Sequence, residues 1–182
     1  MLPSFYQTVR RALVQLALVS VCLGFTYIAT QQTLRQSAND PQIQLAEDVA
    51  NRLTQGTSAQ NLLPSDSVEI SHSLAPYIMF AEAGGNITTS SGMLDGQIPT
   101  LPNGLLHNVK QETRVTWQPR PVIRQALVIV HVSGTSTQFV IAGRSLREVE
   151  RKVDQLNVFG LAAWCAALLI IIANATLARR PE

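Results

Sequence analysis

The side chains that could carry out chemistry in this chain of 182 residues do not form a familiar reactive pattern. The three histidines, His72, His107 and His131, lie far apart, and no two have a metal-ligand spacing such as HxxxH. No serine stands in a GxSxG nucleophile elbow. The pair Gly84-Gly85 lacks the GxxxxGK pattern of a phosphate-binding loop, so it predicts a turn. We therefore expect no catalytic residue, no metal site and no cofactor.

The cysteines and the charges argue against a disulfide framework and against a nucleic-acid partner. Cys22 and Cys165 both lie inside long apolar stretches and are expected to act as small apolar residues. The formal net charge is +2. Residues 31–157 carry 10 Lys and Arg against 11 Asp and Glu, so this central part lacks the basic surface of a nucleic-acid-binding module.

Two stretches are long and apolar enough to cross a bilayer, for which a helix needs about 20 residues. Residues 12–30 contain Gln15 as their one strongly polar side chain, and residues 158–177 contain no charge. The first stretch also has the charged start of a cleaved signal peptide. Its apolar run is longer than usual for one, and the cleavage pattern near residue 30 is poor, which favours an uncleaved anchor. We expect transmembrane helices at residues 12–30 and 158–177.

Arginines flank the outer end of each stretch. Arg10 and Arg11 precede the first, and Arg179 and Arg180 follow the second. Because positive residues favour the cytoplasmic side of a membrane, we expect both termini, residues 1–11 and 178–182, to be cytoplasmic. Residues 31–157 then form one extracytoplasmic domain, large enough to bury its own core. In a bacterium this describes a two-pass protein of the inner membrane, with the lipid bilayer as its first partner.

The central domain is predicted to be α+β, with an antiparallel sheet between two long helices. Asp40 suits an N-cap, Pro41 a first helical turn and Gly56 a C-cap, so a helix is expected between them. Its apolar stripe comprises Ile43, Ala46, Val49, Ala50 and Leu53. Five strands are expected within residues 76–83, 86–90, 113–118, 124–132 and 137–142. We expect the fourth to be central in the sheet and Gly143 to end the fifth.

A second long helix is expected from Ser145 to about residue 178, running directly into the second transmembrane stretch. Its stripe of Leu146, Val149, Val153 and Leu156 follows a three-four spacing. This stripe either packs on the apolar stripe of the first central helix or couples the domain mechanically to the membrane helices, and the two interpretations are compatible.

Small residues inside the two transmembrane stretches could bring helices close together. Ser20 and Gly24 form a small-xxx-small pair, as do Ala162 and Ala166. Such pairs allow close approach of two backbones in a membrane, so we expect these residues at helix contacts, including those of a homodimer.

This order of elements resembles the extracytoplasmic sensor region of bacterial transmembrane receptors, especially sensor histidine kinases. Their Cache-like or PAS-like domains lie between two membrane helices. The stretch FVIAGRSLREVERKVDQL, residues 139–156, resembles the last strand and exit helix of such receptors. The stretch YIMFAEAGGNITTSSG, residues 77–92, resembles their first sheet strands around a turn. These motifs are more specific for architecture than for a ligand.

The resemblance implies a ligand pocket between the sheet and a long loop. Tyr77, Trp117, Arg124 and His131 could face such a pocket, with Arg124 holding a carboxylate and aromatic rings lining the wall. The receptors continue past their second helix into a HAMP linker and a kinase or other output domain, whereas this chain stops at Glu182. We therefore expect it to act through a membrane partner such as a kinase, unless it has lost signalling or is a fragment of a longer receptor.

The sequence thus predicts a non-enzymatic, sensor-like membrane protein. Its outer domain would bind a small ligand or a protein, and its helices would pass that event to another membrane protein. The alternative is a structural or accessory subunit whose outer domain is a docking surface without a ligand. A closed, dry interface between sheet and loop would favour the alternative.

Overall fold

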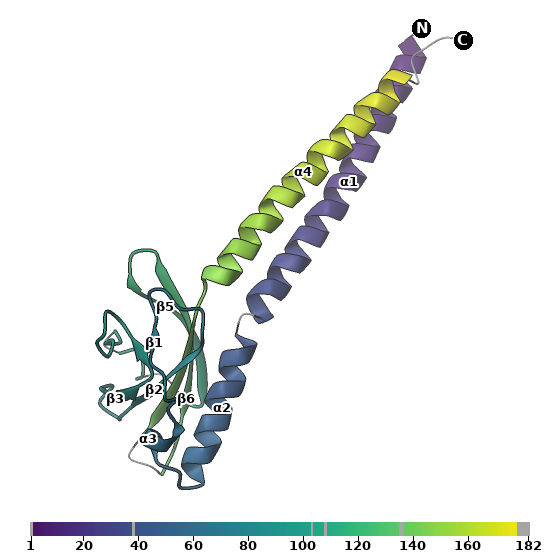
Figure 1. Ribbon diagram of the computed structural model, residues 1–182. Helices are drawn as coiled ribbons and strands as arrows, with labels where there is room; N and C mark the ends of the chain where they lie inside the picture. Colours follow the sequence, from purple (N-terminus) through teal and green to yellow (C-terminus); the bar gives the residue numbers. More distant parts are fainter. Residues whose placement is uncertain (1, 38, 103, 108, 135–136, 178–182) are drawn as a thin grey trace. The chain divides into compact units, whose positions relative to one another are not determined.

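The computed structural model describes residues 2–37, 39–102, 104–107, 109–134 and 137–177. The chain divides into two compact units, residues 1–34 with 151–182 and residues 35–150. Arg179 and Arg180 lie outside the described residues. The secondary structure is α+β, with an antiparallel five-stranded sheet that falls between two long helices in sequence (Figure 1). This confirms the predicted fold class at the level of elements and sheet.

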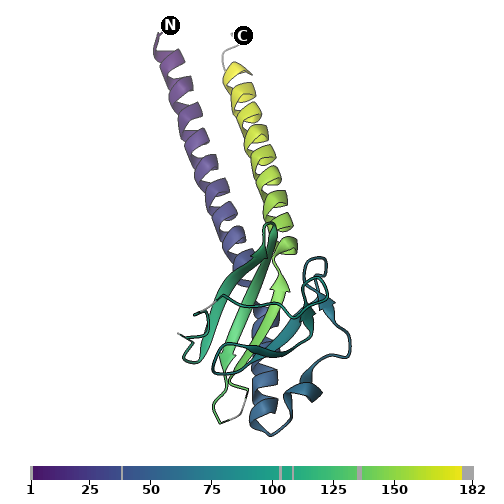
Figure 2. The same ribbon diagram turned by 90° about the vertical axis from the view of Figure 1, so that its left-hand side faces the viewer.

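The first unit is built from two long antiparallel helices, α1 (Leu2–Ser37) and the greater part of α4 (Arg147–Leu177) (Figures 1 and 2). Each helix contains an 18-residue stretch apolar enough to cross a membrane, and none of that stretch is buried within the protein. A soluble protein would bury such a stretch, because apolar surface left in water costs about 25 cal/mol per Å². The chain therefore has two candidate membrane-spanning helices, which include the predicted residues 12–30 and 158–177.

Polar side chains join the two helices within this unit. The Tyr27 hydroxyl donates to Asn157 Oδ1 at 2.6 Å, and the Gln31 amide donates to Tyr27 at 3.5 Å. Trp164 Nε1 donates to Ser20 Oγ at 3.1 Å. Hydrogen bonds between helices in a bilayer contribute about 0.6–2 kcal/mol each. These bonds fix which faces of α1 and α4 meet.

The second unit contains helix α2 (Asp40–Thr54), which begins one residue away from the predicted cap. Asn39, and not Asp40, occupies the N-cap position. At the other end, Gly56 has a left-handed φ of +91°, which costs glycine little. The N–H groups of Gly56 and Thr57 donate to carbonyls of the last turn at 3.0 and 3.1 Å. These two bonds form a Schellman motif, so Gly56 ends the helix as predicted.

Five antiparallel strands form the main sheet, in the order β3-β2-β7-β6-β5 (Figure 2). They are β2 (Tyr77–Ala81), β3 (Ile87–Ser90), β5 (Glu112–Arg120), β6 (Ile123–His131) and β7 (Phe139–Ser145). All five lie where the sequence predicts strands. However, β7 and not β6 is the middle strand, and it continues through Gly143 instead of ending there.

Three short elements lie outside the main sheet. The strands β1 (Val68–Glu69) and β4 (Gly92–Met93) pair in parallel as a separate two-stranded sheet. The single turn α3 (Ala59–Leu62) follows α2. None of the three was expected from the sequence, because segments of two to four residues are too short for a hydrophobic period to be recognised.

Hydrophobic side chains cover both faces of the main sheet, because successive residues of a strand point to opposite sides. One face packs against the predicted stripe of α2 (Figure 2). The buried members of this helix-side cluster are Ala46, Val49, Ala50, Leu53, Ile78, Phe80, Val128, Val132, Val140 and Ala142. The other face packs mainly against loops. The buried members of this loop-side cluster are Ile70, Tyr77, Met79, Ala81, Leu106, Val109, Trp117, Leu127, Ile129, Phe139 and Ile141.

The ring of Tyr77 lies between two glycines, which explains why a glycine stands inside β7 at position 143. A Cβ atom at Gly143 would overlap the Tyr77 ring, and one at Gly92 would come within 2.5 Å of it. Tyr77 is only 1% exposed, and among the described residues its hydroxyl has no hydrogen-bond partner. Burial raises the pKa of the Tyr77 hydroxyl above its ordinary value, so this group stays neutral.

Removing the Tyr77 hydroxyl is expected to stabilise the second unit. Tyr77→Phe keeps the ring between its two glycines and removes a buried polar group without a partner, which should raise the free energy of unfolding by about 1 kcal/mol. Denaturant unfolding of the full chain in detergent, followed by Trp117 fluorescence in a Trp164→Phe background, measures the change. A loss of 1 kcal/mol or more would show that the hydroxyl contributes a bond.

Candidate functional site

A cavity of about 530 Å³ opens in the second unit between the β2–β3 turn and the segment that follows β4. It is lined by residues 84–87, 98–102, 104, 106 and 107. Its volume falls within the roughly 300–1,000 Å³ that is common for small-molecule sites. Its position, between the sheet hairpin and the long loop, matches the region in which the resemblance places a pocket. Its lining residues are not the four that we expected.

Hydrogen bonds hold the turn that forms the first wall. Gly85 N–H donates to Glu82 O at 2.9 Å, and Glu82 N–H donates to Asn86 O at 3.1 Å. Gly85 has a φ of +85°, a conformation that residues with side chains rarely adopt. The turn predicted from Gly84-Gly85 is therefore confirmed, and glycine at position 85 is required by its backbone conformation.

A second tight turn precedes the loop that forms the other wall. Leu94 N–H donates to Gln97 O at 2.8 Å, and Gln97 N–H donates to Leu94 O at 3.2 Å. The two residues between them, Asp95 and Gly96, have φ values of +53° and +74°. Positive φ at both central positions defines a type I′ turn, for which Asp-Gly is a favoured pair. The sequence analysis did not predict this turn, although the Asp-Gly pair is a signal for it.

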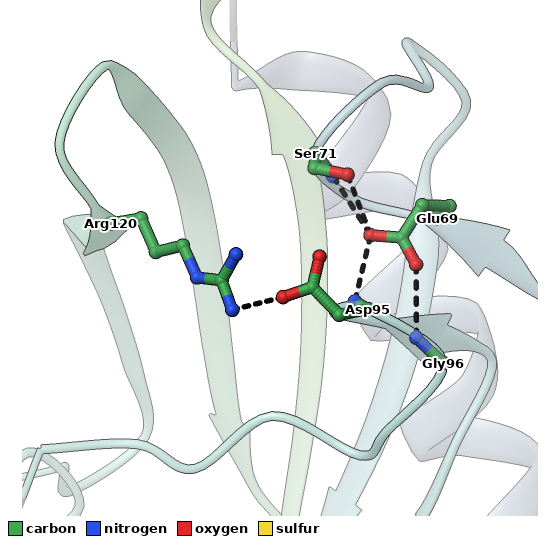
Figure 3. A network of polar contacts seen from close by, with 5 residues as sticks. All are labelled: Glu69, Ser71, Asp95, Gly96 and Arg120. Atoms are coloured by element: carbon green, nitrogen blue, oxygen red, sulfur yellow. Dashed lines mark hydrogen bonds and ion pairs between the residues drawn. The ribbon is translucent and has the colours of Figure 1, made fainter.

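The carboxylate of Glu69, at the end of β1, holds this Asp-Gly turn in place (Figure 3). Its two oxygens accept the N–H groups of Asp95 and Gly96, at 3.2 and 3.3 Å. One oxygen also accepts the Ser71 hydroxyl at 2.7 Å and the Ser71 N–H at 3.3 Å. Asp95 in turn pairs with the guanidinium of Arg120 on β5. This network ties the segment before the cavity loop to β1 and to the edge of the main sheet.

The four hydrogen bonds also set the acidity of Glu69. Partial burial raises the pKa of this carboxyl, but the hydrogen bonds from Ser71, Asp95 and Gly96 outweigh it and hold the pKa below its ordinary value. Glu69 is therefore a carboxylate at neutral pH. Three of its four donors are backbone N–H groups and the fourth is the Ser71 hydroxyl, so its role is to hold neighbouring loop residues in place.

The floor of the cavity is continuous with the hydrophobic core. Leu106 is 5% exposed and belongs to the loop-side cluster. Ile87 and Leu101 are half-buried and pack against the same cluster. Polar side chains stand at the rim, where Asn86 and His107 are both exposed. The cavity therefore combines apolar side chains that continue into the core with hydrogen-bonding groups, and its exposed lining is more polar than that of most ligand sites.

The structure does not bring the four predicted ligand residues together. Tyr77 and Trp117 are buried members of the loop-side cluster and do not line the cavity. Arg124 and His131 are seven residues apart on β6, roughly 23 Å at 3.3 Å per residue. Arg124 donates to Glu150 at 2.7 Å, while the His131 ring lies 5.3 Å from that of Phe139. A single pocket of these four residues is therefore ruled out by their positions in the sheet.

The two apolar stripes that were predicted to pack on each other, residues 146–156 and the stripe of α2, have different surroundings. Leu146, Val149, Val153 and Leu156 are all half-buried, and the last three lie on α4. Leu146 lies in the junction before it, because Ser145 ends β7 and the helix begins at Arg147, not at Ser145 as predicted. Mechanical coupling through these residues stays a prediction. Ile43, Ala46 and Val49, the proposed packing partners of that stripe, lie against the sheet instead.

The small residues of the transmembrane stretches also divide into two groups. Ser20 contacts α4 through Trp164. Gly24 has open space around the position of a Cβ, and Ala162 and Ala166 are exposed. The last three therefore do not mediate the contact between α1 and α4, and a role in packing against another chain stays a prediction.

Neither a metal site nor a similarity to known proteins indicates a function for this chain. Among the residues that the structure describes, no group of three or more His, Cys, Asp or Glu side chains could hold a metal ion. No family model, no curated protein and no solved structure matches the chain. What the protein does must therefore be argued from its geometry.

Proposed function

We propose that this chain is a two-pass membrane protein whose second unit is an extracytoplasmic, sensor-like domain that binds a small ligand. In this proposal α1 and α4 cross the inner membrane, and both termini are cytoplasmic. The domain is of the Cache-like or PAS-like kind and carries out no catalysis. The observation that carries the proposal is the cavity of about 530 Å³ in a folded unit that is joined in sequence, at both ends, to a helix apolar enough to span a membrane.

The cavity favours ligand binding over the alternative of an accessory subunit with only a docking surface. That alternative expects the interface between sheet and loop to be closed, whereas this interface contains a cavity with an apolar floor and a polar rim. The arginine pairs Arg10-Arg11 and Arg179-Arg180 support the orientation, because positive residues favour the cytoplasmic side.

The relay part of the proposal rests on the helices. Ligand binding would shift a population between two arrangements of α1 and α4, and a kinase-like membrane protein or a second copy of the chain would respond. The hydrogen bonds Tyr27–Asn157 and Trp164–Ser20 support this, because they link α1 and α4 so that a displacement of one is felt by the other.

Labelling of single cysteines tests the orientation. In a Cys22→Ala, Cys165→Ala background, Ser67→Cys places a thiol on the exposed surface of the second unit, and Gln7→Cys places one before the first membrane stretch. In spheroplasts, a membrane-impermeant maleimide should label position 67 and should label position 7 only after the membrane is permeabilised.

The reverse labelling pattern would reject the orientation. Labelling at both positions, together with release of the protein by alkaline carbonate, would reject membrane insertion. The control for access is a detergent-treated sample, in which both cysteines should react.

A further inference from the structure

The lining of the cavity in the second unit is poorly suited to an ion. None of the described lining residues is Asp, Glu, Lys or Arg. The polar side chains of the lining belong to Asn86, Thr100 and His107, and the rest is apolar side chain or glycine. A charged ligand gives up its hydration when it binds, so a site for one normally supplies an opposite charge.

Two guanidinium groups elsewhere in the second unit already have carboxylate partners. Arg120 pairs with Asp95 in the network of Figure 3, and Arg124 pairs with Glu150 at 2.7 Å. Recruiting either arginine to an anion in the cavity would break an existing ion pair. This differs from the expectation that Arg124 holds a carboxylate, because Arg124 does not line the cavity.

The remaining chemistry suits a neutral molecule with an apolar body. Ile87, Leu101 and Leu106 form a hydrophobic floor that continues into the core. The Asn86 amide both donates and accepts hydrogen bonds, and Thr100 adds a hydroxyl that does the same. An amide, alcohol or carbonyl group of a ligand would find a partner at this rim without any charge being desolvated.

We infer that the cavity takes an uncharged, partly apolar ligand that carries an amide, alcohol or carbonyl group. This rests on the proposed function, in which the cavity is the ligand site. At about 30 Å³ per water molecule, 530 Å³ corresponds to roughly 18 waters, so a ligand of about a dozen non-hydrogen atoms fits.

Three probes of matched size test the charge preference. Benzamide is neutral, benzoate is an anion and benzylamine is a cation at pH 7, and all share one aromatic ring. The full chain, in lipid nanodiscs and labelled at isoleucine and leucine methyl groups, is titrated with each. Benzamide should shift the methyl signals of Ile87, Leu101 and Leu106 saturably in the millimolar range, and both charged probes should bind at least tenfold more weakly.

A variant with a blocked cavity shows whether the shifts come from this site. Thr100→Trp adds bulk at the rim and should abolish the benzamide shifts, whereas Thr116→Trp, at an exposed position on β5 outside the cavity, should preserve them. Methyl signals of the helix-side cluster, such as those of Leu53, show whether each variant is folded. Equal or tighter binding of benzoate or benzylamine would overturn the inference but leave the ligand site standing. No shift with any probe would count against both the inference and the ligand site.

Discussion

Replacing Gly143 by alanine is expected to lower the free energy of unfolding of the second unit by roughly 3 kcal/mol, the upper part of the usual range for overpacking a core. The added Cβ would overlap the buried ring of Tyr77. The ring has little room to move away, because the backbone of Gly92 lies close against its other side. Domains are stable by only about 5–15 kcal/mol, so this single methyl group should remove a large part of the total.

The matched control is Gly84→Ala. A Cβ at Gly84 meets only the Asn86 amide, at 3.9 Å, so the substitution should change stability by less than about 0.5 kcal/mol. Denaturant unfolding of the full chain in detergent, read by Trp117 fluorescence, compares the two variants. If the overlap is the cause, Tyr77→Leu should cost less in the Gly143→Ala background than alone, and strictly additive effects would contradict it.

Glu69→Gln is expected to lower the free energy of unfolding by about 1–2 kcal/mol at pH 7. The substitution replaces a carboxylate that accepts four hydrogen bonds with an amide that has one accepting atom. Glu112→Gln is the control. Among the described residues, the Glu112 side chain pairs with the exposed guanidinium of Arg114, and such a surface pair should be worth less than about 1 kcal/mol. The same fluorescence measurement applies. A loss no greater than that of the control would show that Glu69 does not hold the Asp-Gly turn.

The stabilisation that Glu69 contributes to the folded state should also depend on pH, and the direction follows from its pKa. The folded-state pKa of this carboxyl lies below its ordinary value of 4.5, which is the value for the unfolded chain. The stabilisation is therefore fully present above pH 4.5 and is lost as the pH falls through the lower, folded-state pKa. The difference between wild type and Glu69→Gln should shrink as the solution is acidified through this window, and a difference that grew in acid would contradict the assignment.

The five strands of the main sheet could be predicted because each carries a local signal. Alternating or continuous apolar residues mark the strands, and Gly84-Gly85 marks the turn between the first two. Strand order was harder to predict. The strand at residues 124–132 is apolar at its centre, and so is β7, so composition did not show which of them lies in the middle.

The role of Gly143 could not be read from the sequence. Glycine commonly ends a strand, and the prediction used that general rule. The actual cause is the ring of Tyr77, 66 positions earlier in the chain and on a neighbouring strand. A close approach between strands depends on their pairing, which the local sequence around Gly143 does not contain.

The candidate site shows the same limit. The resemblance predicts a pocket between the sheet and a long loop, and a cavity lies in that region, but its role as a ligand site stays a prediction. The residues that line the cavity were not predicted. The side chains chosen for their chemistry, Tyr77, Trp117, Arg124 and His131, are placed by the strands in the core or at opposite ends of β6. Most residues that line the cavity come from glycine- and proline-rich segments outside the strands, and Ile87 is the first residue of β3. Such turns have no periodicity from which the direction of a side chain can be predicted.

The two faces of the main sheet are covered by different kinds of structure, and this affects where the protein can accept mutations. One face is sealed by a regular helix, α2, whose apolar stripe tolerates few substitutions because each side chain fills a defined space. The other face is closed by irregular segments, where a residue can be exchanged without disturbing a repeat. Substitutions in the loop segments could therefore change the chemistry of that surface while the sheet and helix beneath it stay the same.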